Sequence, residues 1–142
     1  MVTQFKVVYT FLAINFLLPA LYYCFDPIGA AELYYSLAGL LGSDAKQTWS
    51  EDSRFWLILG IGNVATLGFM CVLMLRDLVS NYNLLLPLCF LKSCSIVGFF
   101  VAWLSHGHPS FLIGVVFDSI TLFCMIFFAQ RAHTTLTAQV QE

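Results

Sequence analysis

The chain has 142 residues, of which 60% are hydrophobic and 10% are charged, and its formal net charge is −2. Soluble domains carry about a quarter charged residues, so this composition excludes an ordinary soluble domain and indicates a membrane domain. Only six residues are Lys or Arg, and they are scattered along the chain, which excludes nucleic acid as a partner.

Four apolar runs predict membrane-spanning helices, at residues 5–23, 55–75, 84–104 and 111–130. Each run is close to the roughly 20 residues that cross about 30 Å of hydrocarbon as a helix. The first run lacks a small-x-small cleavage site and exceeds the apolar core of a signal peptide, so we expect it to be retained as a span. The predicted fold is all-α, an integral membrane four-helix bundle in which residues 1–142 form a single transmembrane domain.

The segment between the first two spans is divided into an apolar part and a polar part. Residues 27–41 are mostly apolar but too few to cross the membrane, so we expect a short interfacial or re-entrant helix there. Residues 42–54 are polar and predict a loop. The Ser and acidic residues at 50–53 supply capping groups for the helix that follows.

Basic residues near the span ends indicate the orientation in the membrane. Lys6, Arg76 and Arg131 flank the spans on one side, whereas Lys46 and Arg54 lie on the other side within an acidic loop. Cytoplasmic segments carry the excess of Lys and Arg, so we expect both termini to be cytoplasmic.

Polar side chains are rare within the predicted spans, and they fall at similar depths, roughly 10–15 Å from one end of the span that carries them. The candidate ligand-binding or structural polar layer consists of Asn15, Asn63, Lys92, Ser95, Asp118 and Thr121. A charge at such depth costs about 2.5–3.5 kcal/mol, so we expect Lys92 and Asp118 to form an ion pair inside the bundle. Pro19 cannot donate to the carbonyl of Asn15, which is expected to leave that oxygen free at a helix kink.

Two interpretations of this polar layer follow from the residues alone. Buried polar groups can fix the register of packed helices, so the layer is one way to hold the bundle together. Ionisable residues within a membrane are also typical of functional sites, and Lys92 offers a donor to a lipid headgroup or a quinone carbonyl. The sequence predicts membrane lipids as partners and a lipid or quinone as the bound ligand on the second interpretation.

The sequence predicts no catalytic residue, no metal site and no cofactor. His106 and His108 are two residues apart in a predicted loop, but a third metal ligand is not apparent. The five cysteines include no CxxC pair, which argues against dithiol redox chemistry. Phosphate-binding loops and nucleophile motifs are missing from the sequence as well.

The arrangement of these features resembles the DoxX-like group of small four-helix membrane proteins. The resemblance covers four spans in about 140 residues, a lysine in the third span and an aspartate in the fourth. It also rests on Asp26 and Pro27, on Arg54 before the second span, and on Gly60, Gly62 and Gly68 within it. The resemblance implies the fold and no particular activity.

These observations predict a non-enzymatic membrane protein that acts as an accessory or assembly subunit of a membrane complex. Its expected protein partners are other membrane subunits or further copies of itself. One alternative is a small proton-coupled transporter in which Asp118 exchanges the proton, although no inverted repeat is evident. A second alternative is a membrane enzyme acting on a lipid or quinol. Identifying co-purifying polypeptides, measuring proton flux and assaying turnover would separate these three functions.

Overall fold

The computed structural model describes residues 1–26, 29, 32, 36, 39 and 51–140, with the side chains of 51–57 and 140 left aside. This part of the chain is all-helical, with α1 (Val2–Phe25), α3 (Glu51–Arg76), α4 (Leu85–His106) and α5 (Pro109–Val140) as its long helices. A short 3₁₀ helix, η1 (Tyr82–Leu84), precedes α4. All four long helices contain segments apolar and long enough to cross a membrane, so the predicted integral multi-pass membrane protein is confirmed.

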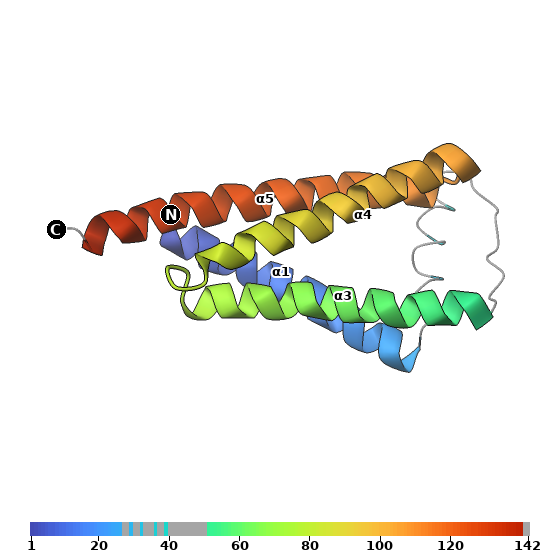
Figure 1. Cartoon of the computed structure of the whole chain (residues 1–142), viewed down its shortest axis with the longest axis horizontal. Helices are drawn as coiled ribbons and strands as arrows, with labels where there is room; N and C mark the ends of the chain where they lie inside the picture. The colour runs from blue at the N-terminus through green and yellow to red at the C-terminus, as the bar shows by residue number, and fades with distance from the viewer. Residues whose placement is uncertain (27–28, 30–31, 33–35, 37–38, 40–50, 141–142) are drawn as a thin grey trace.

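The helices form two antiparallel hairpins, α1 with α3 and α4 with α5 (Figure 1). Helix α1 also packs on α5, whereas α3 and α4 touch only slightly. Both chain termini and the turn between α3 and α4 lie at one end of the bundle, which we call the terminal end (Figure 1). The opposite end, where α4 turns into α5, we call the loop end. The two hairpins lie together at the terminal end and diverge towards the loop end (Figure 1).

The buried core is largest where the two hairpins lie together. Its members are concentrated towards the terminal end, where all four helices are within reach of one another. The core consists of Phe5, Tyr9, Leu12, Ala13, Phe16, Leu67, Cys71, Met74, Leu78, Leu85, Leu88, Met125, Ala129 and Ala132. The buried residue of α4 nearest the loop end is Lys92. Beyond it, large apolar side chains such as Val97, Val101 and Leu104 are exposed, as expected of surfaces that face lipid.

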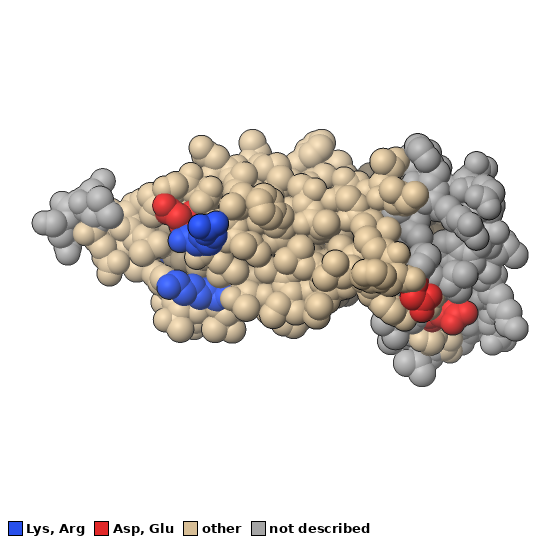
Figure 2. Space-filling model, turned by 90° about the horizontal axis from the view of Figure 1, so that it is seen from below, with Lys and Arg blue, Asp and Glu red and all other residues tan. Residues whose placement is uncertain are grey.

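On the face shown in Figure 2, the charged side chains lie at the two ends of the molecule. Basic groups gather at the terminal end beside an acidic group, and acidic groups lie at the loop end, with an uncharged belt between them. An uncharged belt bounded by polar ends is the surface that a bilayer requires.

Glycines allow the close approaches within each hairpin. A Cβ added to Gly68 of α3 would lie 2.6 Å from Cγ of Leu17 on α1. A Cβ added to Gly114 of α5 would lie 2.9 Å from Cδ2 of Phe99 on α4. Such distances are too short for a side chain, so the glycines set how closely the paired helices lie.

The helix ends are fixed by local hydrogen bonds. Helix α4 stops at Gly107, whose φ of 67° is left-handed and whose N–H donates to the carbonyl of Trp103 at 2.7 Å. Pro109 then occupies the first position of α5, where its missing N–H costs nothing. Beyond the end of α3, Asn81 donates through its amide to the carbonyls of Leu73 and Asp77.

The largest differences from the predicted bounds are at the start of α3 and at the end of α5. Helix α3 begins at Glu51, so the last residues of the predicted 42–54 loop are helical. Helix α5 continues to Val140, ten residues past the predicted end at 130, because its last turns still have packing partners. Ala132 is buried, and the ring of His133 stacks on Tyr82 with the centroids 3.9 Å apart. The predicted interfacial helix at 27–41 and the loop residues 42–50 lie largely outside the described residues.

Candidate functional site

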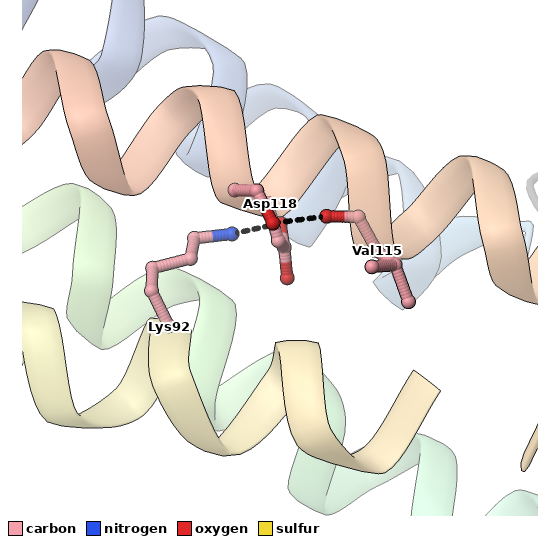
Figure 3. A network of polar contacts seen from close by, with 4 residues as sticks. Lys92, Val115 and Asp118 are labelled. Carbon is pink, nitrogen blue, oxygen red and sulfur yellow. Dashed lines mark hydrogen bonds and ion pairs between the residues drawn. The ribbon is translucent and has the colours of Figure 1, made fainter. Parts of the chain in front are cut away.

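Lys92 of α4 and Asp118 of α5 form an ion pair inside the bundle, as the sequence predicts. The Lys92 Nζ donates to Oδ1 of Asp118 at 2.6 Å, and the two residues are 6% and 5% exposed. Figure 3 shows the lysine reaching from α4 towards α5, where the aspartate lies. A charge-assisted hydrogen bond of this length offsets part of the cost of burying both charges.

The ammonium of Lys92 also meets the first hairpin. Its Nζ lies 4.6 Å from the centroid of the Phe16 ring on α1, which is a cation–π contact. Lys92 therefore connects the two hairpins at the level where they begin to diverge, through its contacts with Asp118 on α5 and Phe16 on α1.

The other polar groups near Asp118 do not add to the ion pair. Ser119 donates its hydroxyl to the carbonyl of Val115 at 2.7 Å, one turn earlier in α5. Thr121 is buried on the same face of α5 as Asp118. Among the described residues, no fully buried side-chain nitrogen or oxygen lacks a hydrogen-bond partner. Each charge of the ion pair therefore has its partner, which is what a register-fixing role requires.

The remaining members of the predicted polar layer do not gather at the ion pair. Asn15 and Ser95 are half-buried, and Asn63 is exposed on α3. Within the described part of the chain, none of these three side chains makes a hydrogen bond. Helix α1 runs through Pro19 without a break from Val2 to Phe25. Three of the six predicted residues, Lys92, Asp118 and Thr121, thus form the buried polar site.

Sequence reasoning missed Tyr9 as a member of the buried polar network. Tyr9 is fully buried, and its hydroxyl donates to the carbonyl of Met125 on α5 at 3.0 Å. The sequence does carry a signal for the burial of Tyr9. This residue shares one face of α1 with the apolar residues Phe5, Leu12 and Phe16. A tyrosine near the start of a span is more often an interfacial residue, so its type alone does not indicate burial.

The described residues hold no group of three side chains suited to a metal ion. His108 shares a 2.7 Å hydrogen bond with Ser110, and His106 lies at the exposed end of α4. Two cavities, of about 390 and 270 Å³, lie at the terminal end of the bundle, and neither is lined by Lys92 or Asp118. Binding of a lipid or quinone at the ion pair therefore stays a prediction.

The chain matches no family model, no curated protein and no solved structure in the comparisons made. The DoxX-like resemblance stays a prediction from the arrangement of the sequence.

Proposed function

We propose that the chain is a non-enzymatic membrane protein that serves as an accessory or assembly subunit of a membrane complex. The observation that carries the proposal is the outward face of α3. Asn63 lies on this face, exposed and without a hydrogen bond among the described residues. The apolar run in α3 begins at Phe55 in the sequence and ends before Arg76, so Asn63 is about 12 Å from one end and about 20 Å from the other.

An amide side chain at this depth needs a hydrogen-bond partner from protein, because lipid tails cannot form hydrogen bonds with it. Asn side chains are among those that hydrogen-bond across neighbouring helices in membranes. The rest of this face suits a close approach. Gly62 and Thr66 are exposed beside Asn63, one turn apart, and a Cβ added to Gly62 would meet nothing within 4 Å. Small residues at this spacing let a second transmembrane helix come near enough to bond the amide.

Between Ile58 and Leu75, the other faces of α3 are packed against the bundle or carry apolar side chains. Leu67, Cys71 and Met74 point into the core, and Asn63, one turn before Leu67, lies at the border between this core face and the outward face, where it is exposed. Helix α1 covers this inner side, and α4 touches α3 only slightly. A partner helix can therefore lie along Leu59, Gly62, Asn63, Thr66 and Phe69 without displacing any helix of the bundle.

A pair of matched glycine variants tests the proposal. A Cβ added at Gly98 of α4 also meets nothing within 4 Å, so Gly62→Ile and Gly98→Ile place the same side chain on two open faces of the monomer. We expect both variants to fold. After mild purification from native membranes, Gly62→Ile should lose its associated polypeptides, and Gly98→Ile should keep them. Recovery of the wild-type chain without any other polypeptide, or equal association of both variants, would contradict the proposal.

The proposed orientation places both termini in the cytoplasm. Lys6, Arg76 and Arg131 are all exposed and belong to the terminal end, which supports this orientation. In a chain freed of its exposed cysteines, Ser105→Cys at the loop end should react with an impermeant thiol reagent in intact cells. Thr134→Cys should react only after the cells are opened. The reverse pattern would invert the topology.

A further inference from the structure

A cavity of about 270 Å³ lies at the terminal end, between the start of α1, the end of α3 and the last turns of α5. Its apolar lining includes Val2, Phe5 and Leu136 from two of these helices. Phe5 is buried, and Leu136 packs against the core, so this lining is part of the folded bundle. The volume is just below the roughly 300–1,000 Å³ of small-molecule sites, which suits a headgroup and the start of one chain.

The same cavity is lined by three charged residues, Lys6, Arg76 and Asp77. Neither Lys6 nor Arg76 makes an ion pair within the part of the chain that the structure describes. The carboxylate of Asp77 is already held, because Ser80 donates to Oδ1 through its N–H at 3.1 Å and to Oδ2 through its hydroxyl at 2.6 Å. Two unpaired cations and one engaged carboxylate leave the cavity with a net charge of +1.

The position of the cavity relative to the bilayer follows from the apolar spans. One span begins at Val2 and another ends at Arg76, and both residues line the cavity. The cavity is therefore at the boundary between hydrocarbon and headgroups, where lipid phosphates lie. Basic pockets between membrane helices bind anionic headgroups at this depth.

We propose that this cavity binds an anionic phospholipid with a single negative charge. Its phosphate accepts hydrogen bonds from the ammonium of Lys6 and the guanidinium of Arg76, and its acyl chain begins against Val2 and Phe5. The net charge of +1 favours a headgroup of charge −1 over a zwitterionic one of the same size. This site is separate from the outward face of α3, so the lipid proposal does not depend on the proposed protein partner.

The test uses the full chain in a mild detergent, with dioleoyl-phosphatidylglycerol and dioleoyl-phosphatidylcholine as the two probes. Native mass spectrometry counts the bound lipid at each concentration. We expect phosphatidylglycerol to bind at least about tenfold more tightly, which is the scale of one or two basic contacts. Equal binding of the two lipids would overturn the proposal.

Variants then locate the site. The double variant Lys6→Gln/Arg76→Gln should lose most of the preference for phosphatidylglycerol. Arg131→Gln is the matched control, because Arg131 is an exposed cation at the same end that contacts Phe127 and does not line the cavity. It should keep the preference. An unchanged preference in the double variant, or an equal loss in Arg131→Gln, would contradict the assignment.

A measurement on the wild-type chain covers the case in which the double variant fails to fold. Raising the salt concentration from about 0.05 M to about 0.5 M screens exposed charges. The preference for phosphatidylglycerol should fall several-fold over this range, whereas a preference that ignores salt would exclude recognition through Lys6 and Arg76.

Discussion

Lys92 donates a 2.6 Å hydrogen bond to Asp118, and no residue of α4 nearer the loop end is buried. The ion pair thus lies where the packed part of the α4–α5 hairpin gives way to its lipid-facing part. Phe16 covers the ammonium from α1, so the pair also holds the first hairpin against the second. Removal of this ion pair should therefore lower the stability of the whole bundle.

We predict that the single variants Lys92→Met and Asp118→Leu each lose about 3–5 kcal/mol of stability, because each leaves one buried charge without its partner. The double variant should regain most of this loss, since it buries no charge at all. Thermal unfolding in detergent measures all three. Strictly additive losses would show that the two residues do not depend on each other.

The double variant also separates the two interpretations of the ion pair. If the pair only fixes helix register, the double variant should retain its associated polypeptides as the wild type does. Loss of association despite normal folding would assign the charges themselves a role in binding.

Tyr9→Phe removes the hydroxyl that bonds the Met125 carbonyl and changes little else. We expect it to cost about 0.5–1.5 kcal/mol, the usual range for one hydrogen bond inside a protein or between membrane helices. Tyr22→Phe is the matched control, because the Tyr22 hydroxyl is exposed and its contact with Asp26 is 3.4 Å long. Equal melting temperatures for Tyr9→Phe and the wild type would show that the Tyr9 bond adds nothing.

The sequence predicted the four spans and the Lys92–Asp118 pair because both depend on strong local terms, namely hydrophobic length and the cost of an unpaired charge in lipid. It predicted Asn63 as part of the same layer from depth alone. Depth does not show where the two hairpins diverge: Asn63 precedes the buried Leu67 by one turn of α3, yet it is exposed because the buried core does not extend that far towards the loop end. The length of α5 was underestimated because hydropathy marks the membrane edge, whereas the helix is extended by packing of Ala132 and His133 beyond it.

Acid should destabilise the turn after α3, because it protonates the carboxylate of Asp77. The hydrogen bonds from Ser80 hold the pKa of this carboxyl below its ordinary value of 3.8. A lowered folded pKa stabilises the fold at pH values above the ordinary one, and the stabilisation is lost as the pH falls through the folded pKa.

We therefore expect Ser80→Ala to lower the melting temperature at pH 7 and to narrow the gap from the wild type as the pH approaches about 3. Ser105→Ala is the control, because its hydroxyl bonds a backbone carbonyl of α4 and no carboxylate. Parallel pH profiles for Ser80→Ala and the wild type would contradict this role of Asp77.

Photo-crosslinking in native membranes tests most directly whether a partner lies on the outward face of α3. Benzoylphenylalanine in place of Phe69 puts the probe on this face, and the same residue in place of Phe123 puts it on an exposed face of α5. Both positions are exposed phenylalanines, so neither replacement disturbs the core. The account predicts an adduct with a different polypeptide from position 69 and none from position 123. A position 69 that crosslinks only to lipid or to a second copy of this chain would contradict it.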